Sequence, residues 1–344
     1  MPRLADRFPS VPADRLVAEL VPPPRFDGER FETYRPDPAQ QSQAAAVGAM
    51  RSFAARLSAP PRRSGWFRRK EEIRGPSGIY LDGGFGVGKT HLLTSLWHAA
   101  PRPKAFGTFV EFTNLVGALG FNAAVEALSG HRLICIDEFE LDDPGDTVLV
   151  STLLTRLTES GVQLGATSNT LPGSLGAGRF DAEDFLREIQ GLAARFEVLR
   201  IEGEDYRHRG LPAAPPPSDD SLLVAAASSL PGATLDDFPA LIAHLSRLHP
   251  SRYGALLDGV EAVFLRGVSS VADQNAALRL VVLADRLYDR DVPVVASGQP
   301  LDGLFPQELL SGGYRKKYSR AISRLVALAR EGERVGERTL RRSS

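Results

Sequence analysis

Hydrophobic and polar positions between residues 73 and 205 alternate between two patterns. Short apolar runs, typical of strands buried on both faces, are separated by runs with helical periodicity. The five expected strands lie at 78–83, 106–113, 133–139, 162–169 and 196–203. Helices are expected at 89–99 and 147–160. Strands that alternate with helices predict an α/β fold: a parallel five-stranded sheet sandwiched by helices.

The rest of the chain divides by composition. We expect an N-terminal extension, a core, a Pro-rich linker, a mainly helical C-terminal unit and a charged tail, at 1–72, 73–205, 206–220, 221–330 and 331–344. Strand-like runs within 260–298 leave open whether the C-terminal unit extends the main sheet or forms a sheet of its own. No internal repeat is apparent.

A glycine-rich segment, GGFGVGKT at 83–90, follows the first strand and opens the first helix. It matches the pattern G-x-x-x-x-G-K-[ST], in which backbone N–H groups wrap around phosphate oxygens at the positive end of a helix. Lys89 is expected at the β- and γ-phosphates, and the Thr90 hydroxyl on Mg²⁺. The expected nucleotide-binding residues are Gly83, Gly84, Phe85, Gly86, Val87, Gly88, Lys89, Thr90 and His91.

Two further strand ends carry polar side chains suited to nucleotide hydrolysis. Asp137 ends the third apolar run and is expected to hold Mg²⁺, while Glu138 orients and deprotonates the attacking water. Asn169 ends the fourth strand, which is expected between the other two site strands, and would hold that water or the γ-phosphate. The chain has no Asn-Lys-x-Asp motif for guanine, so ATP is favoured over GTP.

Composition gives little sign of nucleic-acid binding or of membrane insertion. The net charge is −1, one cysteine is present, and no apolar run approaches the roughly 18 residues that a membrane-spanning helix needs. We therefore expect a cytoplasmic protein without stable nucleic-acid binding and with at most peripheral membrane contact. A basic segment with two aromatics, 62–70, is either a solvated loop or a contact for an anionic surface.

Several motifs together carry a family resemblance. They are RFETYRPDPAQQSQ at 30–43, YLDGGFGVGKTHLL and LICIDEFELDD around the expected site, ATSNTLPGSL after the fourth strand, EGEDYRHR at 202–209, ALRLVVLADRLYDRDVPVVASG and YSRAISRL at 318–325. With them the chain resembles the AFG-type AAA+ ATPases, the family that includes the bacterial ZapE cell-division ATPases. The resemblance implies a P-loop AAA+ fold with a C-terminal lid, ATP hydrolysis and nucleotide-dependent homo-oligomers.

The resemblance also implies roles for arginines. By position, Arg279 corresponds to the family's sensor-2 arginine, which reaches the γ-phosphate. An arginine finger from a neighbouring subunit is expected among Arg179, Arg187 and Arg195, with Arg179 favoured. The family usually has an arginine after the sensor asparagine, where this chain has Thr170. The stretch after Leu175 also matches the family's pattern only loosely, with Arg187 in place of a proline, and this departure bears on the choice of finger.

Three functions remain open at this stage. The favoured one is an ATP-hydrolysing protein that acts on a protein partner, by resemblance the FtsZ-type division polymer, in the cytoplasm and at the division site. The alternative is a nucleic-acid ATPase of the DnaC-like helicase-loader type, against which the nearly neutral charge counts. A third is a nucleotide-gated scaffold that turns over slowly.

Overall fold

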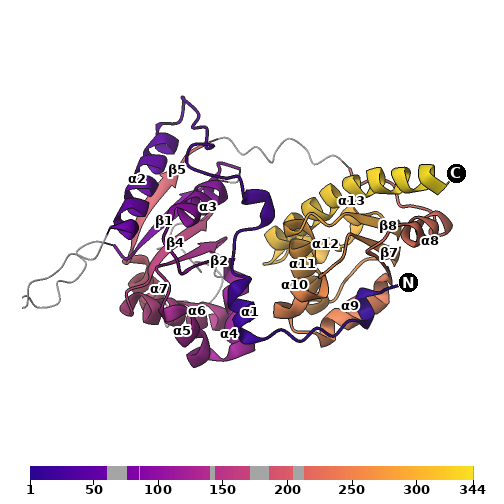
Figure 1. The fold of residues 1–344 in the computed structure, drawn as a ribbon, viewed down its shortest axis with the longest axis horizontal. Coiled ribbons are helices and arrows are strands. Elements are labelled where there is room, and N and C mark those ends of the chain that lie inside the picture. The colour runs from indigo at the N-terminus through magenta and orange to yellow at the C-terminus, as the bar shows by residue number, and fades with distance from the viewer. Residues whose placement is uncertain (60–75, 85, 140–143, 171–185, 204–212, 344) are drawn as a thin grey trace, which may run out of the picture. The chain divides into compact units, whose positions relative to one another are not determined.

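The chain folds into two compact units (Figure 1). The computed structural model describes residues 1–59, 76–84, 86–139, 144–170, 186–203 and 213–343. The core unit comprises residues 13–22 and 26–209, and the C-terminal unit comprises 1–12, 23–25 and 210–344. The expected N-terminal extension is therefore not a unit of its own, because its residues are shared between the two.

The core unit is built on a five-stranded parallel sheet with the order β2-β3-β4-β1-β5. The strands are β1 (Gly78–Gly83), β2 (Lys104–Thr108), β3 (Leu133–Asp137), β4 (Gln163–Ser168) and β5 (Phe196–Ile201). The predicted parallel five-stranded sheet is confirmed. So is the predicted place of the fourth strand between the strands that lead into the glycine loop and into the Asp-Glu pair.

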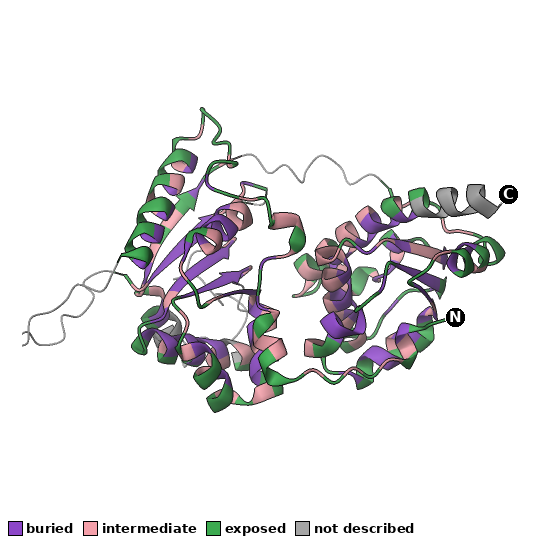
Figure 2. Ribbon diagram, in the orientation of Figure 1, coloured by how far each residue is buried: buried purple, intermediate pink, exposed green. Residues whose placement is uncertain are grey.

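Helices cover both faces of this sheet. Helices α2 (Gln41–Ser58) and α3 (Lys89–Ala99) pack on the face that carries Ile79 and Leu81. The opposite face carries Tyr80. It is covered by α4 (Phe109–Leu119), α5 (Phe121–Ser129), α6 (Pro144–Glu159) and α7 (Leu186–Ala193), and α1 (Ala13–Ala18) also packs there. The central strands β1, β3 and β4 are almost wholly buried while the outer helix faces are exposed, as Figure 2 shows, and the edge strand β5 is only partly buried. Alternate strand residues thus feed two separate cores.

The expected strand at 106–113 is wrong over its second half. The strand β2 ends at Thr108, and helix α4 begins at Phe109. Thr108 caps this helix, because its hydroxyl accepts the Glu111 N–H while the Glu111 carboxylate accepts the Thr108 N–H at 2.6 Å. The aromatic and β-branched residues that suggest a strand instead recur at helical spacing, and Phe112 is fully buried. A capping box and helical periodicity outweigh strand propensity here.

The C-terminal unit contains a separate parallel sheet with the order β6-β7-β8. Its strands are β6 (Ala233–Asp237), β7 (Ala262–Val268) and β8 (Val294–Gly298). Its helices are α8 (Asp220–Ser229), α9 (Phe238–Arg247), α10 (Tyr253–Leu256), α11 (Gln274–Asp289), α12 (Gln307–Ser311) and α13 (Arg315–Ser343). The unit is mainly helical, as expected, and its strands do not extend the main sheet.

The two sheets share an arrangement that the sequence did not reveal. In each, three parallel strands that are consecutive in the chain lie side by side, β2-β3-β4 in the core unit and β6-β7-β8 in the C-terminal unit. A helix follows the first strand directly in both cases, starting at Phe109 and at Phe238.

The first residues of the chain pack into the C-terminal unit. Leu4 is fully buried, and the backbone N–H groups of Leu4 and Ala5 donate to the Asp236 carboxylate at 3.0 and 2.8 Å. Asp236, the residue before the last in β6, has no solvent exposure, and burial raises the pKa of its carboxyl group. Short 3-10 turns, η1 (Leu4–Asp6), η2 (Pro24–Phe26), η6 (Pro250–Arg252) and η7 (Leu301–Gly303), complete the described elements.

Helix α13 is tied to α11 by ion pairs. Asp285 accepts from Arg320 at 3.0 Å and also from Arg324. Burial raises the pKa of Asp285, but the two guanidinium charges outweigh it, so the pKa lies below its usual value. The expected charged tail belongs to α13, which continues to Ser343. In the middle part of this helix a Cβ at Gly332 would lie 2.2 Å from the Val294 carbonyl oxygen, so only glycine allows this close approach to β8.

No helix in the described part of the chain is both long and apolar enough to cross a membrane.

Candidate nucleotide-binding site

The glycine loop links the end of β1 to the start of α3. Gly86 and Gly88 adopt positive φ angles of 80° and 85°, and Gly88 is the N-cap of α3. This left-handed backbone favours glycine, which explains the residue type at these two places. The loop therefore ends at the positive end of an eleven-residue helix, where backbone N–H groups gather. Phe85, a predicted loop residue, lies outside the described residues.

The side chain of Lys89 contacts the backbone at the start of the glycine loop and a residue directly after β4. Its Nζ atom donates to the carbonyl oxygens of Gly83 at 2.8 Å and Gly84 at 2.5 Å, and to Oδ1 of Asn169 at 2.9 Å. The strand order explains this contact, because β4 lies next to β1 and both strands end at the same edge. The structure thus brings together two residues that are 80 positions apart in the chain. A phosphate at the loop would give this ammonium group a stronger, anionic partner.

Thr90 and Asp137 lie in direct contact beside the loop. The Thr90 hydroxyl is 3.1 and 3.0 Å from the two carboxylate oxygens of Asp137. Asp137 is only 8% exposed. Burial and the neighbouring Glu138 charge raise its pKa to about 6, although the hydroxyls of Thr167 and Thr90 and the charge of Lys89 oppose that rise. A buried carboxylate with a raised pKa is one that a bound cation would stabilise.

The donor atoms here fit Mg²⁺. A threonine hydroxyl and a carboxylate are hard oxygen ligands, and Mg²⁺ in nucleotide sites commonly takes one or two such ligands and completes its shell with phosphate and water. Within the described ranges, no group of three or more His, Cys, Asp or Glu side chains could hold a metal ion. A Mg²⁺ ion at this place would therefore be held by Thr90 and Asp137 together with the nucleotide.

Thr167 on β4 is a site residue that the sequence did not single out. Its hydroxyl donates to Oδ1 of Asp137 at 2.5 Å and accepts the Glu138 N–H at 3.0 Å. Its carbonyl oxygen accepts the Phe139 N–H at 2.7 Å. Glu138 has a φ angle of 55°, which is unusual for a residue other than glycine. Thr167 therefore fixes both members of the Asp-Glu pair. The sequence signal that could have indicated Thr167 is the group of small polar residues at the end of the buried fourth strand, in GATSN.

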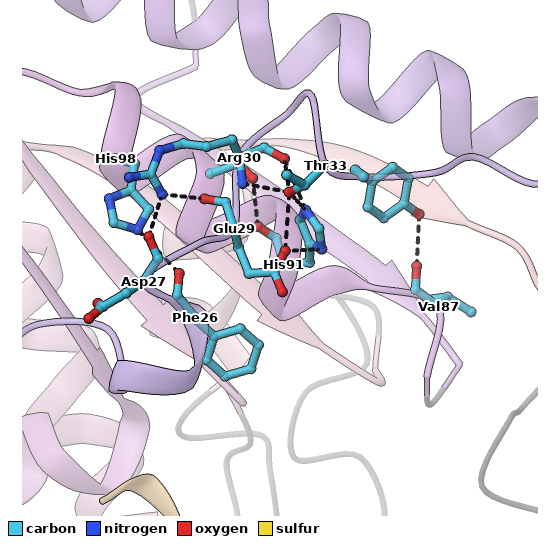
Figure 3. A network of polar contacts seen from close by, with 10 residues as sticks. Phe26, Asp27, Glu29, Arg30, Thr33, Val87, His91 and His98 are labelled. Carbon is cyan, nitrogen blue, oxygen red and sulfur yellow. Dashed lines mark hydrogen bonds and ion pairs between the residues drawn. The ribbon is translucent and has the colours of Figure 1, made fainter.

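The ring of His91 contacts residues 29–33, a segment that precedes the sheet in the chain (Figure 3). Its Nδ1 atom lies 2.9 Å from the Glu29 carboxylate, and Nε2 lies 3.0 Å from the Thr33 hydroxyl and 2.9 Å from the Arg30 carbonyl oxygen. Each ring nitrogen thus has a partner within residues 29–33. The structure places His91 next to the loop, as expected from its position, but gives its ring a contact with this segment.

The predicted arginines lie in different situations. Arg179 is outside the described residues, and so is the side chain of Arg187. Arg195 donates to the Thr158 hydroxyl at 2.7 Å. Arg279 belongs to the C-terminal unit, where its guanidinium group donates to two backbone carbonyls within that unit, of Leu245 at 2.9 Å and Leu248 at 2.8 Å. The roles proposed for these arginines remain predictions.

Fold and site together define the class, a P-loop protein of the AAA+ type. Its features are a parallel sheet, a glycine loop at a helix N-terminus and an acidic pair at the end of β3, which is separated from β1 by β4. A family model of the AFG1-like ATPases matches residues 10–230 and 224–335. The chain belongs to the AFG1-like ATPase family.

Individual relatives match part of the chain. The cell division protein ZapE of Escherichia coli (strain K12) is 30% identical over 168 residues, which span 43% of each chain. An uncharacterized protein of Schizosaccharomyces pombe is 28% identical over 150 residues, 38% of this chain and 33% of its own. The matches thus span less than half the length of these relatives.

Solved structures with a similar fold are more distant. One is DnaI, at 17% identity and a TM-score of 0.42, covering 55% of this chain and 98% of that one. Another is AMPPCP-bound DnaA from Aquifex aeolicus, at 15% identity and a TM-score of 0.39, covering 53% and 52%.

Proposed function

We propose that this protein hydrolyses ATP to ADP and phosphate with Mg²⁺ and uses the reaction to act on a protein partner. The observation that carries the proposal is the cluster of Thr90, Asp137 and Thr167 directly beside Lys89. These residues would bring a cation site and a phosphate-binding lysine together, and Thr167 also holds the backbone of Glu138, the proposed acidic residue for the water. Membership of an ATPase family supports the same reaction.

Binding would begin at the glycine loop. The phosphates would lie against the N–H groups at the start of α3, and the ammonium group of Lys89 would exchange its carbonyl partners for β- and γ-phosphate oxygens. Asn169 already contacts Lys89 at 2.9 Å and would follow it to the γ-phosphate. Mg²⁺, held by Thr90 and Asp137, would supply positive charge at the phosphate oxygens.

Glu138 is the proposed base for the attacking water. Its backbone N–H donates to Thr167 and its φ angle is 55°, so the neighbouring strand holds the backbone of Glu138. In the reaction, a water proton passes to the Glu138 carboxylate, the water oxygen bonds the γ-phosphorus, and the bond to the ADP oxygen breaks. Arg279 and one of Arg179, Arg187 and Arg195 would add positive charge in a homo-oligomer.

The proposed partner is a tubulin-like division polymer of the FtsZ type, with the protein in the cytoplasm at the division site. The name of the Escherichia coli relative, a cell division protein, supports this choice. The formal net charge of −1 favours a protein partner over nucleic acid, because bulk nucleic-acid binding rests on a basic surface.

The test is phosphate release from ATP by the full chain, measured alone, with FtsZ polymer and with single-stranded DNA. Lys89→Ala should lose nucleotide binding, and Glu138→Gln should bind ATP without cleaving it. Matched controls are Lys316→Ala and Glu126→Gln, since both residues are exposed, Lys316 on α13 of the C-terminal unit and Glu126 on α5 of the core unit.

Each outcome has a distinct meaning. Turnover that both variants abolish and that FtsZ polymer changes would support the proposal. Stimulation by single-stranded DNA alone would favour a helicase loader instead. A wild-type protein that binds ATP without turnover would leave a nucleotide-gated scaffold and remove the role of Glu138.

A further inference from the structure

The segment of residues 29–34 lies against the outer side of the glycine loop (Figure 3). The Tyr34 hydroxyl donates to the Val87 carbonyl oxygen at 2.8 Å. Its ring also lies against the next residue, because a Cβ added to Gly88 would be 2.5 Å from the ring edge. One side chain therefore touches two consecutive loop residues directly before Lys89.

The hydroxyl of Tyr34 is suited to this contact. Burial raises the pKa of Tyr34, so the group remains protonated and a donor at neutral pH. Peptide groups are planar and trans, so the C=O of Val87 and the N–H of Gly88 point in opposite directions. Holding this carbonyl from the outside therefore turns the Gly88 N–H away from Tyr34. In the pattern that this loop matches, such N–H groups are directed at phosphate oxygens.

Tyr34 is itself held in place by α3. Its ring meets the ring of His91 edge-on, with the centroids 5.3 Å apart. His91 in turn contacts Glu29 at 2.9 Å and Thr33 at 3.0 Å, and Thr33 closes a tight turn by accepting the Arg30 N–H at 2.9 Å. These contacts hold the segment against the first turn of α3, directly after the loop, and so restrain the position of Tyr34.

We infer that Tyr34 is a positioning residue for phosphate binding: its hydroxyl fixes the orientation of the Val87–Gly88 peptide in the glycine loop. This inference rests on the proposed function only in taking residues 83–90 as a phosphate site. It needs neither ATP hydrolysis nor a particular partner. A group that orients loop N–H donors acts on the phosphates of any ligand and leaves the base and the ribose untouched.

The experiment measures affinity for two ligands, ADP and inorganic tripolyphosphate, both with Mg²⁺, by calorimetry on the full-length protein. Tyr34→Phe removes only the hydroxyl, and we expect about threefold to tenfold weaker binding of both ligands, by the same factor, as the loss of one hydrogen bond implies. Tyr34→Leu also removes the ring that covers Gly88 and should weaken both ligands further.

The matched control is Tyr253→Phe in the C-terminal unit, whose hydroxyl donates to the Leu245 carbonyl oxygen at 2.8 Å. It removes a hydrogen bond of the same kind and length, so any general loss of stability should appear in it too. We expect its melting temperature without ligand to fall about as far as that of Tyr34→Phe, while its affinity for ADP stays at the wild-type value. The comparison uses ADP because Tyr253 also contacts Arg279, which is proposed to reach a γ-phosphate, and ADP lacks that group.

Weakened ADP binding with unchanged tripolyphosphate binding would overturn the inference, because Tyr34 would then act on the nucleoside. Unchanged binding of both ligands to Tyr34→Phe would also overturn it. A wild-type protein that binds both ligands but cleaves no ATP would refute the proposed function and leave the role of Tyr34 standing. A wild-type protein that binds neither ligand would refute both.

Discussion

Replacing Asp285 with asparagine should destabilise the C-terminal unit without a direct effect on ATP chemistry. The side chain is 20% exposed, and its partners Arg320 and Arg324 are 16% and 20% exposed. Asparagine has nearly the same shape but no charge, so two largely buried guanidinium groups would lose their anion. Asp285 belongs to the Asp-Arg-Leu-Tyr-Asp run on which the family resemblance rests, and so this prediction tests what that signature does.

The magnitude follows from the burial of the ion pairs. Removing one partner of a fully buried pair costs about 3–5 kcal/mol. Because a fifth of each side chain here reaches solvent, and because the amide oxygen can still accept one hydrogen bond, we expect about 2–4 kcal/mol. For a unit of this size that corresponds to a fall in melting temperature of roughly 5–15 °C.

The assay is native-state hydrogen exchange on the full chain, read by mass spectrometry. Amides of α11 and α13 should lose protection, while those of α3 in the core unit serve as an internal reference. Glu331→Gln is the matched control, since it removes a carboxylate that is exposed on α13. Unchanged exchange in α11 and α13 together with lost ATP turnover would refute the reasoning and place Asp285 in the catalytic site.

Three further outcomes can be checked. The difference in free energy of unfolding between wild type and Asp285→Asn should stay constant near neutral pH and shrink as pH falls below about 4. The reason is that a carboxylate whose pKa is lowered by folding stabilises the fold only while it is ionised, and this contribution is lost as acid protonates it. Urea titrations at several pH values test this, and a difference that grew in acid would contradict it. Asp236→Ala should speed amide exchange at residues 4–5, which lose their acceptor; unchanged exchange there would count against the contact. Thr167→Val should lower turnover about 10–100-fold with less than about threefold change in ADP affinity, because it frees the Glu138 N–H; equal losses in both quantities would place Thr167 in binding instead.

The local parts of the nucleotide site could be predicted from sequence because each is encoded within a few neighbouring residues. The boundaries of β1 and α3 and the loop between them follow from an apolar run, a fixed glycine spacing and a helical run. The same local logic failed at Thr108, where a strand-like composition concealed a capping box. It also missed β6, whose short run ends in two aspartates and so looks like a turn.

Contacts between distant residues could not be predicted in this way. Thr167 became part of the site only because the register of β4 beside β3 brings its hydroxyl to Asp137. Tyr34 lies far from the loop in the chain, and only the folding of its segment onto α3 brings its hydroxyl to Val87.

The sequence by itself therefore determined the class of fold, the phosphate loop and the acidic pair, since spacing within one strand, loop and helix is enough to specify them. Tertiary structure decided which side chains hold these parts in position, and that the first residues of the chain belong with the last. The physical reason is that sheet register and packing bring together residues that are far apart in the chain. A pattern of neighbouring residues does not specify which distant residues come into contact.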